Sequence, residues 1–240
     1  EIAETHFQAG EFEEAAKFFS RLQLLDLTAA DQARAEFKAG YSLHLLGDEE
    51  GAVTTLRTYL AQCPNDENVP EARYLLAVSL RALQRSDEAF AVTLELLNEE
   101  KSRIGTDPKR WAYWQGRTGN QLANDFFANG DTLHAAAIYA GLIGLSPDPA
   151  WRLPILYQVA LCRERLGDLD RARAAYRSII DGTGKTPAPE LAELARMAAW
   201  RLEHLDWSDQ INRQVARIFK SPNITAAVAG STPAKIPALP

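Results

Sequence analysis

The stretch DGTGKTP, from Asp181 to Pro187, contains the glycine, lysine and threonine that a phosphate-binding loop uses. In such a loop, backbone N–H groups and the lysine surround the phosphates of a nucleotide. The motif also needs a glycine five residues before Gly184, and Ile179 occupies that position. It must follow a strand, whereas the residues before it have helical periodicity. We therefore interpret the stretch as a loop between helices, and no nucleotide or other cofactor is expected.

The remaining reactive side chains do not form a recognisable catalytic or metal site. The histidines lie far apart, and none has a second histidine or a cysteine four residues later: His6, His44, His134 and His204. Cys63 and Cys162 are too few for a disulfide framework and form no CxxC motif, so they are interpreted as small buried apolar residues. The motifs GxSxG and HExxH do not occur. The sequence therefore predicts a protein that is not an enzyme and binds no metal.

The composition is that of a folded, water-soluble chain. The 240 residues are 46% hydrophobic and 24% charged, and the net charge is −6. A negative balance argues against nucleic-acid binding, which needs clustered Lys and Arg. No run approaches the ~20 apolar residues of a membrane span. No signal peptide is visible, and because the sequence opens on Glu1 instead of methionine, a preceding segment is expected.

An alanine recurs at nearly constant spacing and marks an internal repeat. The five anchor alanines are Ala15, Ala52, Ala89, Ala135 and Ala172, so their numbers differ by 37, 37, 46 and 37. Five residues before the anchor the chain has Gly10, Gly47, Gln84, Gly130 and Gly167. Twelve residues before it stand the small residues Ala3, Gly40, Ala77, Ala123 and Ala160. Seven residues after it stand the large groups Leu22, Tyr59, Leu96, Leu142 and Ile179.

These positions predict two amphipathic helices per unit, joined by a tight turn. Small residues let the two backbones approach closely, and the large groups fill the space beside them. A glycine ends the first helix in the left-handed conformation, and the acid after it favours the start of the second helix. Helix starts are predicted at Thr28, Ser86, Asp107 and Asp148, and proline follows the last two.

The pattern resembles the tetratricopeptide repeat. The second unit is the best match, with Gly40, Leu43, Ala52, Leu56, Tyr59 and Pro64 at family positions. The likeness covers about residues 1–181. The signature tryptophan of the family is missing from every unit, and the third unit has lost its turn glycine. A 37-residue period is similar to that of bacterial envelope proteins, such as outer-membrane assembly lipoproteins and Tol-associated periplasmic repeat proteins. The resemblance therefore favours the periplasm or cell envelope over the cytoplasm.

The resemblance implies an all-α, right-handed α-solenoid of about five helix pairs. The units are expected at residues 1–27, 28–66, 67–100, 108–147 and 149–181. The longer third step places extra residues before a helix that begins after Pro108 and carries Trp111, Tyr113 and Trp114. Those aromatic groups either pack on neighbouring helices or form an exposed ledge for a partner.

Beyond the fifth unit, helical periodicity continues from Pro189 to Leu205 and again from Ser208 to Lys220. We expect two helices within 187–220 that cap the last repeat, because a solenoid otherwise exposes an apolar end. The alternative is a docking face for another subunit. Residues 221–240 are expected to form a flexible or extended tail, which could occupy the chain's own groove or that of a neighbour.

In the tetratricopeptide family the first helix of each unit lines the concave face, which implies a peptide-binding groove. Its outward positions here hold aromatic, amide and arginine side chains, which suit peptide recognition. These are Arg34, Phe37, Tyr41, His44, Tyr74, Arg81, Asn120, Gln121, Asn124, Phe127, Tyr157, Gln158 and Arg165. Tyr41, Tyr74, Asn124 and Arg165 are expected to point into one groove. The family's carboxylate clamp is disfavoured, since Lys38 and Leu75 occupy its asparagine positions.

The sequence thus predicts a non-enzymatic module that binds a protein or peptide partner in its concave groove. The alternative is a structural scaffold that forms a homo-oligomer through its C-terminal helices. The two hypotheses differ in which surface meets the partner.

Overall fold

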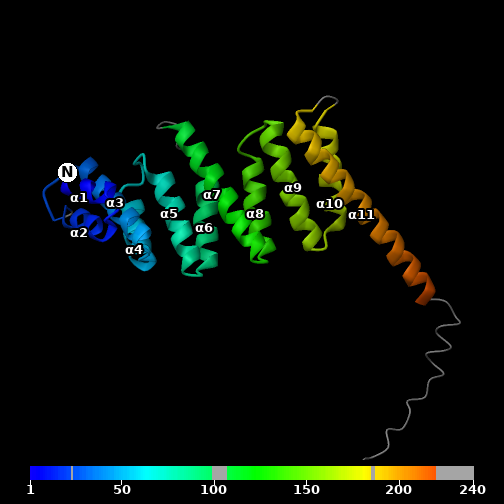
Figure 1. Cartoon of the computed structure of the whole chain (residues 1–240), viewed down its shortest axis with the longest axis horizontal. Coiled ribbons are helices and arrows are strands. Elements are labelled where there is room, and N and C mark those ends of the chain that lie inside the picture. The colour runs from blue at the N-terminus through cyan, green and yellow to red at the C-terminus, as the bar shows by residue number, and fades with distance from the viewer. Residues whose placement is uncertain (23, 99–106, 185–186, 220–240) are drawn as a thin grey trace, which may run out of the picture.

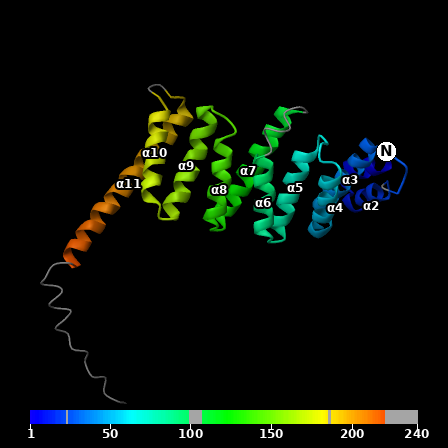
Figure 2. The same ribbon diagram turned by 180° about the vertical axis from the view of Figure 1, so that it is seen from behind.

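The computed structural model describes residues 1–22, 24–98, 107–184 and 187–219. Eleven α-helices follow one another in this part of the chain, and Figure 1 shows them as an elongated row. They are α1 (Ile2–Gln8), α2 (Phe12–Leu22), α3 (Ala29–Leu46), α4 (Glu49–Gln62), α5 (Val69–Ala82), α6 (Ser86–Asn98), α7 (Pro108–Ala128), α8 (Thr132–Ile143), α9 (Pro149–Arg165), α10 (Leu169–Gly182) and α11 (Pro189–Phe219). The first ten helices form five pairs, as expected of an all-α solenoid, and the view from behind shows the same order (Figure 2).

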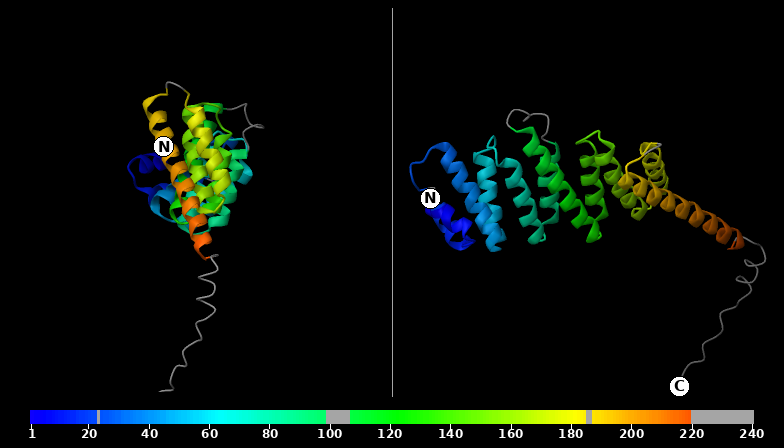
Figure 3. Two further views of the ribbon diagram at one scale, coloured as in Figure 1. Left: turned by 90° about the vertical axis from the view of Figure 1, so that its right-hand side faces the viewer. Right: turned by 45° about the horizontal axis from the view of Figure 1, so that its top comes forward.

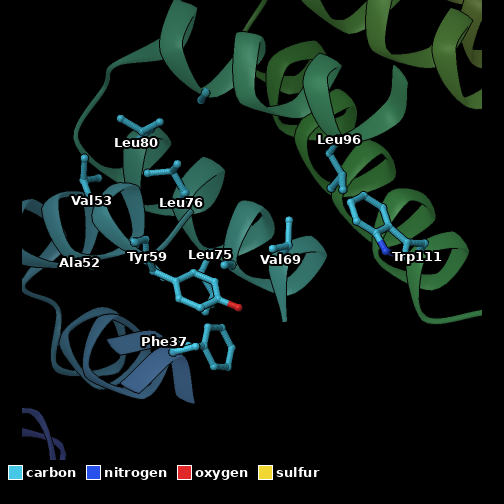
Figure 4. Close-up of a cluster of buried hydrophobic side chains, with 14 residues drawn as sticks. Phe37, Ala52, Val53, Tyr59, Val69, Leu75, Leu76, Leu80, Leu96 and Trp111 are labelled. Atoms are coloured by element: carbon cyan, nitrogen blue, oxygen red, sulfur yellow. The ribbon is translucent and has the colours of Figure 1, made fainter. Parts of the chain in front are cut away.

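The residues of the repeat pattern form the core of the row. The five anchor alanines are completely buried, and so are Tyr59, Leu96, Leu142 and Ile179, seven residues after their anchors. A small residue on the first helix lets a large side chain of the second helix pack closely against it. In the second unit, a Cβ atom at Gly40 would lie 2.9 Å from the side chain of Leu56. The buried groups form four hydrophobic clusters along the row, and Figure 4 shows the one around Tyr59 and Phe37.

Most helix starts have the predicted caps. The Thr28 side chain accepts a hydrogen bond from the Asp31 amide, and Asp107 and Asp148 cap α7 and α9, each with proline as the next residue. The fifth pair follows the same rule, because Asp168 accepts from the Arg171 amide. Each cap satisfies an amide that the helix itself leaves unpaired. The sequence pattern therefore predicts where these helices begin.

The turn of the third unit keeps the left-handed backbone although it has no glycine. Gln84 has φ +59°, while the corresponding Gly10, Gly47, Gly130 and Gly167 have φ between +77° and +88°. The two hydrogen bonds that close the turn are present, from the Gln84 amide to the Arg81 carbonyl and from the Arg85 amide to that of Leu80. The fold of the neighbouring helices therefore imposes a conformation that glutamine disfavours.

Gln84→Gly is accordingly expected to stabilise the protein by about 0.5–1 kcal/mol, because the gain in the turn exceeds the entropy that glycine loses on folding. Urea unfolding followed by circular dichroism measures the effect. The reciprocal change Gly167→Gln serves as the control and should destabilise by a similar amount. Equal midpoints for Gln84→Gly and wild type would contradict the argument.

The C-terminal region differs from the prediction of two capping helices. A single helix, α11, runs through the segment that was expected to separate them. The residues between Leu205 and Gln210 contain neither glycine nor proline, so nothing in them breaks a helix. The Arg173 side chain on α10 also binds both Asp206 and Asp209 there, which keeps this part of α11 against the body. The predicted tail, residues 221–240, lies outside the described residues.

Candidate peptide-binding groove

A groove between α5 and α7 contains several of the residues predicted from the sequence. Its volume is about 770 Å³, and α5 lines it with Val78, Arg81 and Ala82. The opposite wall is α7, which contributes Gln121, Leu122 and Asp125, together with Asn129 directly after its end. Gln84 and Ser86 complete the lining, and we call this cavity the α5–α7 groove. Both walls are first helices of their units, the helices whose outward positions the sequence predicts to form a groove.

An aromatic cluster extends the groove along α7. The ring of Tyr74 lies 5.1 Å from that of Trp114, and Tyr113 meets Trp114 edge-on at the same distance. The Arg117 guanidinium lies 5.0 Å from the Tyr74 ring and 5.3 Å from the Trp114 ring. Tyr74 also donates a hydrogen bond of 3.1 Å to Oε1 of Gln121, which joins the cluster to the groove. We name Tyr74, Tyr113, Trp114, Arg117 and Gln121 the aromatic cluster.

Arg117 carries a positive charge that no described carboxylate neutralises through an ion pair. Its guanidinium instead donates to the Tyr113 hydroxyl over 2.9 Å. Hydrogen bonds to Tyr113 and Tyr74 raise the pKa of Arg117 above its ordinary value, so the group stays cationic. Its side chain is exposed and lies over two aromatic rings. A cation fixed in this way can meet an incoming carboxylate with little loss of conformational freedom.

Arg165 provides a second cation of the same kind on α9. Its guanidinium lies 3.6 Å from the centre of the Phe127 ring and donates to the Phe127 carbonyl over 3.0 Å. Among the described residues it also makes no ion pair. Arg117 and Arg165 are therefore available for negative charge, each positioned by an aromatic ring on α7.

Arg81, at the other end of the groove, is engaged by the protein. It forms an ion pair with Asp125, donates to the Ser86 hydroxyl and lies 4.6 Å from the Phe126 ring. Asp125 also accepts a hydrogen bond of 2.9 Å from Asn129. This network fixes the groove wall and pairs the charge of Arg81. We therefore assign Arg81 the role of holding the groove wall in place.

Several predicted groove residues serve the fold instead. Phe37 is 4% exposed and packs against Tyr59 in the core, so its placement on the groove surface is wrong. It lies one helical turn before Tyr41, and both rings pack against residues of neighbouring helices. Tyr41 is half-buried against Phe7 and Phe37, and burial raises its pKa.

The amides of α7 are also partly used. Asn120 donates to the carbonyl of Gly116 on its own helix, and Oδ1 of Asn124 accepts from the Tyr139 hydroxyl. His44 makes hydrogen bonds of 3.0 Å with Glu49 and with Ser79. Of the predicted amide row, Gln121 alone lines the α5–α7 groove.

The other predicted residues line separate depressions. Arg34 lies in one of about 580 Å³, together with Lys38 and the α4–α5 loop. Tyr157 lines another of about 470 Å³, opposite Met197 and Trp200 of α11. Gln158 and Phe127 are half-buried on α9 and α7.

Sequence reasoning singled out the junction aromatics but missed Arg117. Trp111 is 7% exposed and belongs to the core, Trp114 is half-buried on Tyr74, and Tyr113 is 55% exposed. Some of the junction rings therefore pack on neighbouring helices, and Tyr113 is exposed at the surface. The signal for Arg117 was its spacing, three residues after Trp114 and four before Gln121, which places all three on one helix face.

The described residues provide few other sites for chemistry. They contain no cluster of three His, Cys, Asp or Glu side chains able to hold a metal ion. In the same part of the chain, no helix combines the length and the apolar character needed to cross a membrane. Of the phosphate-loop-like stretch, Lys185 and Thr186 lie outside the described residues.

Two family models match the chain. Residues 1–109 match YfiO, described as an outer membrane lipoprotein, and residues 155–181 match the tetratricopeptide repeat. No curated protein is similar enough in sequence to be a relative.

Several solved structures of repeat proteins are similar to the chain. The nearly identical TPR-like repeats of a Podosopora anserina kinesin light chain are 16% identical, with a TM-score of 0.50 over 83% of this chain and 92% of that one. MamA is 14% identical, with a TM-score of 0.49 over 76% and 94%. YrrB, described as a TPR protein with an unusual peptide-binding site, is 20% identical, with a TM-score of 0.44 over 81% and 88%. The repeat period and the paired helices give the chain an α-solenoid fold similar to that of tetratricopeptide repeat proteins, and the two family models each match part of it.

Proposed function

We propose that the protein is a non-enzymatic binding module that holds a peptide segment of a partner protein in the α5–α7 groove and on the aromatic cluster. The observation that carries the proposal is the position of Arg117, which lies over Tyr74 and Trp114 without a carboxylate partner among the described residues. Aromatic rings and arginine are the groups that contribute most to binding at protein interfaces.

The partner segment should combine carboxylates with apolar or aromatic side chains. Arg117 and Arg165 attract negative charge, while Val78 and the rings of Tyr74 and Trp114 offer apolar surface. The amide of Gln121 and the network around Arg81 supply polar groups at the groove wall. Because the match to YfiO covers residues 1–109, we further propose that the module acts in the bacterial cell envelope.

Selection from a displayed library of random peptides on the intact chain tests the proposal. Peptides enriched on the wild type should carry acidic residues near aromatic or aliphatic ones, and they should be lost on the variant Tyr74→Ala. That change removes a half-buried ring and its bond to Gln121, and circular dichroism checks that the fold is kept. If the same peptides are enriched on both proteins, the aromatic cluster is not part of the binding site, which contradicts the proposal.

A further inference from the structure

The helix α11 has a continuous apolar stripe that the rest of the described chain leaves open. It consists of Met197, Trp200, His204, Trp207, Ile211, Val215 and Ile218. Trp200 and Trp207 are 59% and 58% exposed, and Ile218 is 56% exposed. The rings of Trp200, His204 and Trp207 stack along the helix with centre distances of 5.5 and 6.0 Å. The intervals of three and four residues are those of a helix that pairs with another helix.

The stripe is distinct from the face by which α11 docks on the body. Leu194, Ala198 and Leu205 are buried against α9 and α10. At 100° per residue, the stripe spans about 80° and its centre lies about 120° around the helix from this buried face. Two separate apolar faces on one helix indicate two packing partners. The row of repeats is the partner of the first face.

The last part of α11 extends beyond the helices that support it. Every residue from Gln210 to Ile218 is exposed, and Figure 3 shows the end of the helix projecting from the row. An isolated helical segment of about 12 residues is only marginally stable in water. The projecting segment nevertheless carries Ile211, Val215 and Ile218 on one side, and exposed apolar surface of this kind marks an interaction site.

The charges beside the stripe favour a second copy of the chain as its partner. Glu203 and Arg217 lie on the same edge of the stripe, both exposed and without an ion pair among the described residues. In an antiparallel helix pair related by a two-fold axis, the edge of the stripe on one helix lies beside the same edge of the stripe on the other helix. Glu203 of one copy then meets Arg217 of the other, twice in the dimer. In a parallel pair, like charges would instead lie at the same level.

We propose that two chains associate through an antiparallel, two-fold pairing of this stripe, with Ile211 at the axis. Trp207 then lies opposite Val215 of the second copy, so a large group faces a small one. His204 lies opposite Ile218 in the same register. The pairing joins the chains at their C-terminal ends and leaves the α5–α7 groove of each copy free, which would make the dimer bivalent for a partner.

Sedimentation equilibrium of the full chain tests whether it dimerises. Ile211→Asp places two carboxylates at the axis and is expected to weaken dimerisation by more than about 100-fold. Ala216→Asp is the matched control, because it adds the same charge to an exposed position of the same helix outside the stripe. It should leave the dimer unchanged. A wild type that stays monomeric, or a dimer that survives Ile211→Asp, would overturn the proposal.

A charge-reversal cycle tests the direction of the pairing. Glu203→Arg and Arg217→Glu should each weaken the dimer about tenfold, because each turns two attractive pairs into repulsive ones. The double variant should restore most of the affinity. Additive losses in the double variant would contradict antiparallel pairing.

Disulfide trapping tests the register. In a Cys63→Ser background, in which the remaining Cys162 is buried, Ile211→Cys should crosslink to its symmetry mate under mild oxidation. Val215→Cys should not, because its symmetry mate lies eight residues away along the paired helix. Efficient crosslinking of Val215→Cys would show a parallel pair and exclude the proposed one.

Discussion

Replacing Phe126 with alanine is expected to lower the free energy of unfolding by about 3–5 kcal/mol, which is typical when a buried phenylalanine is truncated in a core. The ring is completely buried at the joint of the third and fourth units. It contacts Phe90 edge-on at 6.4 Å and His134 at 5.2 Å, and the guanidinium of Arg81 lies over it. Alanine would leave a cavity among groups that come from three helices, so the structure cannot collapse to fill it.

The adjacent residue provides a matched control. Phe127 is half-buried and lies beneath Arg165 at the edge of the row, so Phe127→Ala should cost only about 1–2 kcal/mol. Both variants remove the same atoms from neighbouring positions of α7. Urea unfolding followed by circular dichroism compares them, and equal losses would show that the joint around Phe126 does not carry the stability assigned to it.

The helices in which Phe126→Ala loses stability are as informative as the total change in the free energy of unfolding. A solenoid is stabilised mainly by contacts between adjacent units, so unfolding need not be all-or-none. Hydrogen exchange should therefore rise first in α6, α7 and α8 of Phe126→Ala. The helices α1 and α2 make no contact with this joint and should keep the protection of the wild type.

The repeat architecture could be predicted because its determinants are local and periodic. The anchor alanine, such as Ala135, is completely buried in every unit, as expected where a small residue lets two helices approach closely. Helix caps such as Asp148 depend only on the residues that follow them. Gln84 shows the limit of this reasoning, since the turn keeps its shape without the residue type that favours it.

The functional surface was harder to predict because it depends on which partner each side chain finds across the fold. Asn124 stands at a sequence position predicted to bind a peptide, yet its carboxamide oxygen accepts a hydrogen bond from the Tyr139 hydroxyl on the next helix. Phe37 shares a helix face with groove residues but packs on Tyr59. Spacing along one helix gives the direction of a side chain. It cannot tell whether a neighbouring helix has already used that side chain.

The length of α11 was missed for a related reason. Helical periodicity indicates two apolar segments in residues 187–220. Because a short helical hairpin is enough to cap a solenoid, the pattern favours two helices. The apolar residues instead form two faces of one helix that point in different directions. Leu205 faces α10, whereas Trp207 faces solvent. A continuous helix with two apolar faces gives the same sequence pattern as a helical hairpin when no glycine or proline marks a break.

Arg117→Ala is expected to weaken binding of a library-selected acidic peptide by about 10- to 100-fold, which corresponds to about 1.4–2.8 kcal/mol. A hydrogen bond to a charged group contributes about 1.5–3 kcal/mol. Arg117 can make such a bond without first breaking an ion pair to a described residue. Its position over Tyr74 and Trp114 fixes the guanidinium before the peptide arrives, so little entropy is lost on binding. Isothermal titration calorimetry at two salt concentrations measures the affinity and its salt dependence.

Two further variants separate this contact from a general effect of charge. Arg117→Lys keeps the charge but loses the planar group that stacks on the rings, so its affinity should lie between those of wild type and Arg117→Ala. Arg177→Ala removes an exposed arginine from α10, a second helix outside the groove, and changes the net charge equally. It should leave the affinity within about twofold, because charges separated by more than about 8 Å are screened at physiological salt. If Arg177→Ala and Arg117→Ala weakened binding equally, the overall field of the protein would explain the attraction, and the aromatic cluster would have no special role.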